Sequence, residues 1–187
     1  ANLIISFPQN GSYPIALKVQ DPGGKTDIDR VDVNVLNTSP QITSITSEAE
    51  NFTIDEGGLL EVRVIADDTG ADDVLSYAFN WEGDGVYEEG EAISTHRYFN
   101  DGLYAASVRV RDQDGGETSQ PFTVSVNNLP PIIQQIISNN TSSEGDLVTF
   151  QVQAFDPGRD QMTYRFDFEN DGNIDVENQT GTATHIY

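Results

Sequence analysis

Two segments of the sequence carry oxygen-bearing side chains at the spacing of a calcium-binding loop. In each segment a carboxylate or carboxamide stands at loop positions 1, 3 and 5, glycine follows at position 6, and an acid stands at position 9. Ca²⁺ takes about six to eight oxygen ligands, and the glycine permits the sharp wrap that brings them together. The first segment adds an acid at position 12. The candidate metal ligands are Asn80, Glu82, Asp84, Glu88 and Glu91 in the first segment, and Asp167, Glu169, Asp171 and Asp175 in the second.

A β-hairpin turn explains the same residues without a metal. Asp84-Gly85 and Asp171-Gly172 are Asp-Gly pairs, which supply the positive φ that tight hairpin turns need. In that case the neighbouring acids are simply solvated. Both interpretations remain open, because copies of a repeat inherit turns as readily as they inherit metal sites.

Other side-chain combinations that could do chemistry are sparse. The chain has no cysteine and only two histidines, His96 and His185. No Ser-His-Asp spacing or histidine cluster supports nucleophilic or zinc chemistry. Pairs of acids are so common in this chain that none of them marks a glycosidase dyad. We therefore expect no enzymatic activity and assign no catalytic residue.

The chain is strongly acidic, with 31 acidic against 9 basic residues and a formal net charge of −22. This charge repels nucleic acid and anionic membranes, so we expect neither as a partner. The apolar residues come in short runs, and none approaches the roughly 20 residues that a spanning helix needs, so we expect no direct membrane insertion. The acids serve solubility or adaptation to salt, or they bind a divalent cation. Ca²⁺ is the candidate cofactor, because a secreted β-protein without disulfides often needs another brace.

The sequence repeats itself with a period of about 90 residues. Residues 11–40 match residues 102–131 at an offset of 91, and residues 56–98 match residues 144–187 at offsets of 87 to 89. Self-similarity at a fixed period indicates that one structural unit is repeated.

The phase of the repeat predicts one complete unit and two partial ones. Residues 38–130 form the complete unit, residues 1–37 the C-terminal part of a preceding unit, and residues 131–187 the N-terminal part of a following unit. Half a sandwich cannot bury a core alone. Either the chain is a segment of a longer array of repeats, or the partial units of neighbouring copies complete each other by head-to-tail strand complementation.

The elements that must position these loops are all β-strands. Leu75, Tyr77, Phe79 and Trp81 alternate with smaller or polar residues, which is the period of a half-buried strand, and helical periodicity is absent. About seven short strands in 90 residues, with one central tryptophan, indicate an immunoglobulin-like β-sandwich. We expect Trp81 to lie in its core.

Three sequence elements that recur in order resemble those of PKD (polycystic kidney disease) domains. An aromatic strand runs into an acidic Gly turn at Phe79–Gly85 and again at Phe166–Gly172. A His-x-Tyr element at His96–Tyr98 precedes the strand that begins at Gly102, and a Val-x-Asp-x-x-Gly turn follows at Val110–Gly115. The resemblance implies an all-β fold of tandem immunoglobulin-like sandwiches. It also implies an extracellular or cell-surface location in microbes and contact with ligands or proteins rather than catalysis.

A second acidic set follows from the order of strands in such a sandwich, which collects alternate turns at its two poles. Carboxylates of the complete unit would then face those of the following unit across a short linker. A cation would relieve their repulsion, and the alternative is a pair of solvated, flexible acidic poles. The candidate ligands of this inter-domain cation are Glu56, Asp101, Asn128, Asp156 and Asp160, with Asp84 at the same pole. The acids expected at the opposite pole are Asp67, Asp68, Asp72, Asp73, Asp112 and Asp114.

Six Asn-x-Ser/Thr sequons are candidates for glycosylation in an archaeal or eukaryotic exporter. A composition rich in Asn, Ser and Thr explains them equally well. The sequons begin at Asn10, Asn37, Asn51, Asn139, Asn140 and Asn178.

Two functions fit these features. The first is a non-catalytic extracellular structural or adhesive repeat module that forms a spacer, surface coat or filament, braced by Ca²⁺ and partnered by neighbouring copies or repeats of the same protein. The alternative is an accessory module of a secreted hydrolase that binds a surface glycan or a protein. The alternative predicts an exposed aromatic patch around Tyr87, Tyr98 or Tyr104.

Overall fold

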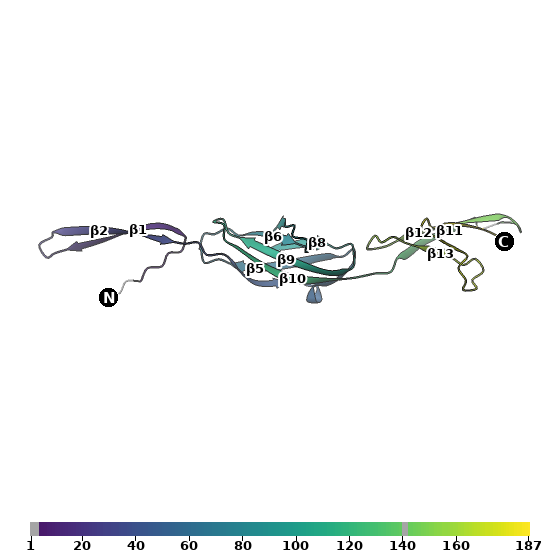
Figure 1. The fold of residues 1–187 in the computed structure, drawn as a ribbon, viewed down its shortest axis with the longest axis horizontal. Coiled ribbons are helices and arrows are strands. Elements are labelled where there is room, and N and C mark those ends of the chain that lie inside the picture. The colour runs from purple at the N-terminus through teal and green to yellow at the C-terminus, as the bar shows by residue number, and fades with distance from the viewer. Residues whose placement is uncertain (1–3, 140–141) are drawn as a thin grey trace. The chain divides into compact units, whose positions relative to one another are not determined.

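The computed structural model describes residues 4–139 and 142–187, and almost all regular structure in it is β-strand (Figure 1). The chain divides into two compact units whose boundaries pass through strands. The boundaries 1–37, 38–130 and 131–187 stay a prediction. The first unit comprises the described residues up to Glu48, together with Glu61–Ser94 and Tyr104–Thr123; the second comprises Ala49–Leu60, Thr95–Leu103 and Val124–Tyr187.

Two sheets form from the strands between residues 41 and 127. The smaller sheet has the order β3-β5-β8 and the larger one the order β4-β10-β9-β6-β7. A short 3-10 turn, η1 (Glu50–Phe52), leads into β4. The strands are β3 (Gln41–Thr46), β4 (Thr53–Asp55), β5 (Leu59–Asp67), β6 (Ser76–Asn80), β7 (Glu88–Gly90), β8 (Ile93–Arg97), β9 (Gly102–Arg111) and β10 (Glu117–Asn127).

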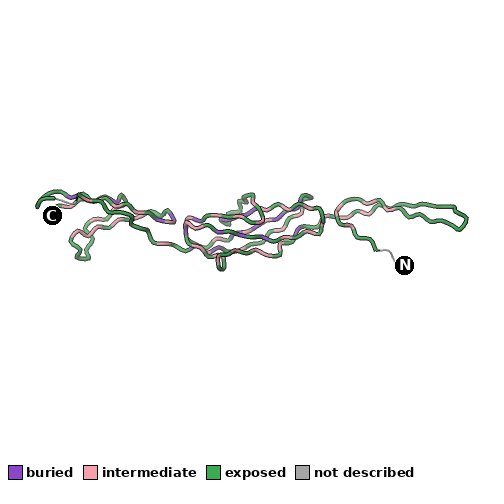
Figure 2. The backbone as a smooth tube through the Cα atoms, turned by 180° about the vertical axis from the view of Figure 1, so that it is seen from behind, coloured by how far each residue is buried: buried purple, intermediate pink, exposed green. Residues whose placement is uncertain are grey.

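The core between residues 41 and 127 follows from the alternation of apolar side chains along the strands. In β5 the side chains of Leu60, Val62 and Val64 are buried while their neighbours are exposed. Phe79 and Trp81 are also buried, and their rings stack with centroids 4.6 Å apart. The predictions of an immunoglobulin-like β-sandwich and of Trp81 in its core are confirmed. Figure 2 shows the buried residues concentrated in this part of the chain.

Ahead of the sandwich, β1 (Gly11–Gln20) and β2 (Thr26–Val35) form a two-stranded antiparallel hairpin. The register pairs Gly11 with Val35 and Gln20 with Thr26. No residue of these two strands is buried in the structure as described (Figure 2).

The strands after residue 131 follow the same order as part of the sandwich. The sheet β11-β12-β15 matches β3-β5-β8, and the pair β13-β14 matches β6-β7. Most apolar side chains here are half-buried or exposed, and only Val148 and Ala183 are buried among the described ones. The bounds are β11 (Ile132–Ser138), β12 (Leu147–Phe155), β13 (Tyr164–Phe166), β14 (Val176–Asn178) and β15 (Thr182–Ile186).

Within the described residues, no helix has the length and apolar character that crossing a membrane requires.

Candidate functional site

Glu56 lies in a tight turn between β4 and β5 that backbone hydrogen bonds fix on both sides. Its N–H donates to the carbonyl oxygen of Asn127 over 2.9 Å, and the N–H of Gly57 donates to the carbonyl oxygen of Tyr98 over 2.7 Å. Gly57 has φ of +72°, a left-handed conformation that favours glycine. The backbone N–H of Leu129 donates to Oε1 of Glu56 over 2.9 Å. The Glu56 carboxylate is therefore held in one position by the folded backbone.

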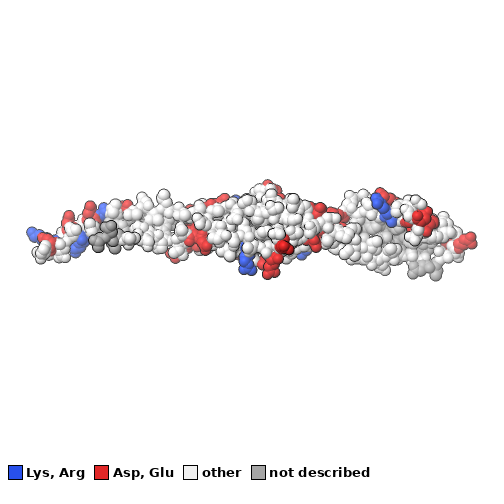
Figure 3. Space-filling view, turned by 90° about the horizontal axis from the view of Figure 1, so that it is seen from below, with Lys and Arg blue, Asp and Glu red and all other residues white. Residues whose placement is uncertain are grey.

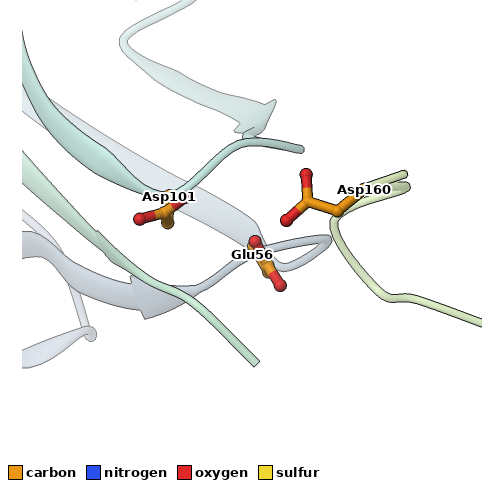
Figure 4. A group of neighbouring side chains, drawn as sticks. All are labelled: Glu56, Asp101 and Asp160. Atoms are coloured by element: carbon orange, nitrogen blue, oxygen red, sulfur yellow. The ribbon is translucent and has the colours of Figure 1, made fainter. Parts of the chain in front are cut away.

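The Glu56 carboxylate is buried and only half satisfied. The residue is 2% exposed, and its Oε2 atom has no hydrogen-bond partner. Carboxylate oxygens of Glu56, Asp101 and Asp160 all lie within 4.8 Å of one another. Figure 4 shows the three side chains. We call these three residues the Glu56 cluster. A buried, unpartnered carboxylate oxygen is costly unless a proton or a cation accompanies it.

The other two members of the Glu56 cluster come from turns on either side of it. Asp101 precedes β9, and Asp160 follows β12. The turn that carries Asp160 is held by Asp156, whose Oδ1 accepts the N–H groups of Gly158 and Asp160. The approach at Gly158 is close, because a Cβ there would lie 2.4 Å from Oε2 of Glu56. None of the three cluster carboxylates forms an ion pair with the described basic residues.

Three like charges gathered around one buried oxygen are the arrangement that a hard cation relieves. Ca²⁺ prefers carboxylate, carboxamide and carbonyl oxygens at flexible geometry. A cation would also offset the mutual repulsion of the three carboxylates. The residues that could hold it are Glu56, Asp101 and Asp160.

Asp68, Asp73 and Asp112 form a second cluster, which we call the Asp112 cluster. Asp112 is 6% exposed; its Oδ1 accepts two turn N–H groups and its Oδ2 accepts Nδ2 of Asn37 over 2.8 Å. The hydrogen bond from Asn37, supported by the turn N–H groups, lowers the pKa of the Asp112 carboxyl. Asp68 and Asp73 each keep one buried oxygen without a partner. The remaining acids predicted at this pole, Asp67, Asp72 and Asp114, lie outside the cluster.

The second predicted loop gathers three of its four candidate ligands. Asp167, Glu169 and Asp175 come within 4.8 Å of one another, and Glu169 also lies 3.3 Å from Nε2 of His185. Asp167 and Asp175 also accept turn N–H groups, from Asp171 and Gly172 and from Phe168 respectively. Asp171 lies outside the group, and its carboxylate accepts hydrogen bonds from the backbone and side chain of Asn173. Those bonds lower the pKa of the Asp171 carboxyl. Because the acids of this loop are largely exposed, they carry less electrostatic cost than Glu56 does.

The first predicted loop does not gather its candidates in the same way. Oδ1 of Asn80 accepts the N–H of Gly83 over 2.9 Å, and Oδ1 of Asp84 accepts the N–H of Val86 over 2.8 Å. These bonds are those of a turn, and no group of three carboxylates forms from this loop among the described residues. The other candidates, Glu82, Glu88 and Glu91, are exposed.

Of the five residues predicted for an inter-domain cation, the structure brings three together in the Glu56 cluster. Asp156 is buried and shapes the turn beside them, whereas Asn128 is exposed. Asp84, expected at the same pole, is outside the cluster. Sequence reasoning could not show that Glu56 is buried or that Gly158 leaves room for its carboxylate, since no local pattern distinguishes Glu56 from the other acids.

The predicted glycosylation sequons differ in how free their asparagines are. Asn51 and Asn139 are exposed, whereas Asn10 is half-buried. Asn37 donates to Asp112, and Oδ1 of Asn178 accepts the N–H groups of residues 180 and 181. Asn140 lies outside the described residues.

The three tyrosines proposed for a binding patch do not form one. Tyr98 is 1% exposed, and Tyr104 is half-buried. Tyr87 lies under the guanidinium of Arg109, 4.1 Å from the ring centroid, and its hydroxyl contacts that of Ser107. The sequence basis for a glycan-binding surface is therefore absent at these positions.

The two-sheet core and its acidic turns define an immunoglobulin-like β-sandwich module. The family model of the PKD domain matches residues 37–126. That segment of the chain belongs to the PKD domain family. PKD domains are typically extracellular and generally non-catalytic modules.

Solved structures add only distant likenesses. The chain is similar to the PKD domain of an M14-like peptidase from Thermoplasmatales archaeon SCGC AB-540-F20, at 21% identity and a TM-score of 0.41, covering 49% of this chain and 98% of that one. It is similar to the fibronectin(III)-like modules of CbhA from Clostridium thermocellum, at 13% identity and a TM-score of 0.36, covering 77% and 79%. It is also similar to extracellular cadherin domains 1–5 of protocadherin gamma B2, at 14% identity and a TM-score of 0.27, and this match covers 94% of this chain and 39% of that one. No curated protein matches the chain.

Proposed function

We propose that this chain is a non-catalytic, extracellular structural or adhesive repeat module that forms part of a spacer, surface coat or filament, and that Ca²⁺ braces it at the Glu56 cluster. The observation that carries the proposal is the buried Oε2 of Glu56, which has no hydrogen-bond partner and lies among the carboxylates of Asp101 and Asp160. A protein interior does not normally leave such an oxygen bare.

The charge distribution supports the same role. On the face shown in Figure 3, acidic side chains gather in separate groups with few Lys and Arg among them. The Asp112 cluster adds a second place where buried carboxylate oxygens of Asp68 and Asp73 lack partners. Turns that concentrate acids in this way suit a module whose stiffness depends on extracellular cations.

The recurrence of strand order supports a repeat array as the setting. The sheet β11-β12-β15 follows the order of β3-β5-β8, at the offset of the sequence repeat. Arrays of small modules suit spacers and coats, because each unit contacts only its neighbours.

The test compares thermal unfolding and calcium binding for the wild-type chain and Glu56→Gln, each in excess Ca²⁺ and in EGTA. The substitution keeps the size of the side chain and the Leu129 hydrogen bond but removes one of three charges. At a Ca²⁺ concentration ten times the Kd, one site stabilises the wild type by about 1.4 kcal/mol. Glu56→Gln should lose this gain and bind one ion fewer by calorimetry.

The sign of the effect in EGTA makes the test sharp. Without a cation, removing a buried like charge should leave Glu56→Gln at least as stable as the wild type. The matched control is Glu61→Gln, an exposed acid in β5, the strand that follows the Glu56 turn, which should behave as wild type in both conditions. A Glu56→Gln variant that kept the full stabilisation and ion count of the wild type would refute Ca²⁺ binding at this cluster.

A further inference from the structure

Two turns that lie one repeat apart have the same local structure. They are residues 68–72, which we call the Gly70 turn, and residues 156–160, which we call the Gly158 turn; their offset is 88 residues. In each turn Oδ1 of the first aspartate accepts the N–H of the glycine two residues later, over 2.9 Å in both. Neither glycine has a positive φ, so the backbone of the turn does not itself require glycine. The reason for a glycine must therefore lie in what surrounds it.

The Gly158 turn lies so close to the sandwich that a side chain would not fit between them. A Cβ at Gly158 would lie 2.8 Å from the carbonyl oxygen of Phe99 and 2.4 Å from Oε2 of Glu56. In return, a Cβ at Gly57 of the sandwich would lie 2.5 Å from the carbonyl oxygen of Pro157. A backbone oxygen cannot move aside as a flexible side chain can, so each glycine permits the approach of the other segment.

The Gly70 turn makes the corresponding contact with the segment ahead of the sandwich. The N–H of Ala71 donates to the carbonyl oxygen of Pro8 over 2.8 Å, and a Cβ at Gly70 would lie 2.6 Å from Oε1 of Gln9. Pro8 corresponds to Phe99 at the repeat offset of 91. The same turn thus meets the same carbonyl group in two places of the chain, which indicates a contact that belongs to the repeat.

The side chains beside the two glycines differ, and their partners differ with them. The guanidinium of Arg159 lies over the ring of Phe99, 3.8 Å from its centroid, and Arg159 holds this position with φ of +66°, which is uncommon for a residue other than glycine. At the corresponding positions the Gly70 turn has Ala71 and the segment ahead of it has Pro8. A guanidinium is attracted to the face of an aromatic ring, whereas alanine and proline offer neither group. The residue pair at this place therefore distinguishes the two contacts.

We propose that the Gly158 turn docks, without a cation, on a surface of the sandwich formed by Glu56, Gly57 and Phe99, and that the Arg159–Phe99 contact makes this surface selective for its own turn. The Gly70 turn has no cation at the position of Arg159 and fits the surface at Pro8 instead. The inference rests on the proposed function only where Ca²⁺ is concerned. Docking brings Asp160 to the Glu56 cluster, so Arg159 is a positioning residue for the third ligand of the cation.

The contacts that hold the docked turn need no ion. Glycine packs against a carbonyl group, and the cation–π contact joins two protein side chains. Repulsion among the carboxylates opposes docking, but Asp101 and Asp160 are exposed, so dissolved salt screens their repulsion. We therefore expect the turn to be docked in EGTA, with Ca²⁺ adding to a contact that has already formed.

An engineered cysteine pair can measure docking directly, because the chain has no cysteine of its own. Asp101→Cys with Asp160→Cys places thiols on two residues whose carboxylate oxygens lie within 4.8 Å of each other, and it removes two of the three cation ligands. The rate of disulfide formation under mild oxidation in EGTA then reports how often the turn is docked. Alkylation and mass spectrometry separate bridged from open chains, and the same chain in urea gives the rate without docking. Fluorescence of Trp81 checks that the sandwich is folded.

Substitutions in the contact should slow this reaction. Gly158→Ala should lower the rate by about 5- to 100-fold, the effect of forcing a methyl group into a packed contact. Arg159→Ala and Phe99→Leu should each lower it by about 2- to 5-fold, the effect of losing an exposed cation–π contact. The two together should slow it no further than either alone, because both remove the same contact. The matched control is Arg165→Ala, which removes a cation of the same segment that pairs with Glu177 and should leave the rate unchanged.

Further variants separate charge from size and positioning from simple electrostatics. Arg159→Lys should keep part of the rate, whereas Arg159→Met, a long side chain without charge, should not. In the chain that keeps all its carboxylates, Arg159→Ala should weaken Ca²⁺ binding by calorimetry, because fewer chains are docked. A residue that acted only through its positive charge would do the opposite, since its removal would strengthen the binding of a cation.

A cysteine pair that closes no faster in buffer than in urea would overturn the inference. Equal rates for the parent pair, Gly158→Ala and Arg159→Ala would also overturn it. The outcome is separable from that of the cation test. Fast closure in a protein that binds no Ca²⁺ refutes the cation site and leaves the docked turn, whereas Ca²⁺ binding at Glu56 with closure as slow as in urea does the reverse.

Discussion

Val110 and Val19 occupy the same position of the repeat, and truncating each to alanine should have very different consequences. Val110 is 0% exposed and faces Tyr77 across the β6–β9 pair, whereas Val19 is 55% exposed. Removing the equivalent of two buried methylenes costs about 1.6 kcal/mol in transfer free energy, at about 0.8 kcal/mol each. The cavity left in a close-packed core adds to this, so we expect Val110→Ala to lose about 2–3 kcal/mol. For Val19→Ala we expect less than about 0.5 kcal/mol in the sandwich.

The single tryptophan makes this comparison selective. Trp81 is the only tryptophan in the chain, and it lies in the sandwich core stacked on Phe79. Urea unfolding followed by its fluorescence therefore reports on the sandwich and not on the hairpin. The midpoint should fall for Val110→Ala at an unchanged slope, which is the signature of lower stability without a change in the surface exposed.

Two results would contradict this reasoning. A loss below about 0.5 kcal/mol for Val110→Ala would mean that β9 does not contribute to the core around Trp81. Equal losses for Val110→Ala and Val19→Ala at low protein concentration would mean that the hairpin is already covered within one chain.

Three further outcomes test other parts of the structure. Gly83→Ala should cost about 1–3 kcal/mol in urea unfolding, because φ is +74° and the new Cβ would lie 2.7 Å from a β9 carbonyl oxygen; Gly85→Ala, with φ of +88° but nothing within 4 Å, should cost less. Asn37→Ala in EGTA should shift acid unfolding to higher pH. The pKa of the Asp112 carboxyl is lowered in the folded state, so its contribution to stability is present above the unfolded-state pKa and is lost as pH falls through the folded-state pKa. Without the Asn37 hydrogen bond the folded-state pKa lies higher, and this stability is lost at a higher pH. Expression in a glycosylating host should modify the exposed Asn51 but leave Asn37 bare, as mass spectrometry of tryptic peptides can show.

Local patterns were enough to predict the sandwich, because its core repeats with the period of a strand. Alternation at Tyr77, Phe79 and Trp81 marks an inward face, and the structure buries Phe79 and Trp81. The acidic loops were less predictable, since Asp84-Gly85 and Asp171-Gly172 have the same local sequence signal. Both loops use side-chain oxygens on turn N–H groups, but only the second brings three carboxylates within 4.8 Å of one another among the described residues. The spacing of the candidate ligands is the same in both loops at positions 1, 3, 5 and 9, so the spacing alone does not predict the difference.

The strand order predicts that acids gather at the poles of the sandwich, but it does not predict which of these acids is buried. Burial separates Glu56 from Asp101 and Asp160, and burial depends on the turn of Asp156 approaching at Gly158. Such an approach joins segments about 100 residues apart in the sequence, which no periodicity encodes. A single sequence therefore predicts where carboxylates concentrate, whereas the structure is needed to identify the oxygen that lacks a partner.

The free energy that one bound Ca²⁺ contributes limits how much a cation can stabilise such a module. Extracellular calcium sites commonly have Kd values of about 10⁻⁴ to 10⁻³ M. At millimolar Ca²⁺, one site then contributes only about 0.4–1.4 kcal/mol to the stability of the folded joint. That is too little to fold a module but enough to change the population of an ordered joint severalfold. In an array of such modules, stiffness would then depend on how many Glu56 clusters hold Ca²⁺. Substitution of Glu56 should remove the calcium dependence of one module while the sandwich around Trp81 stays folded.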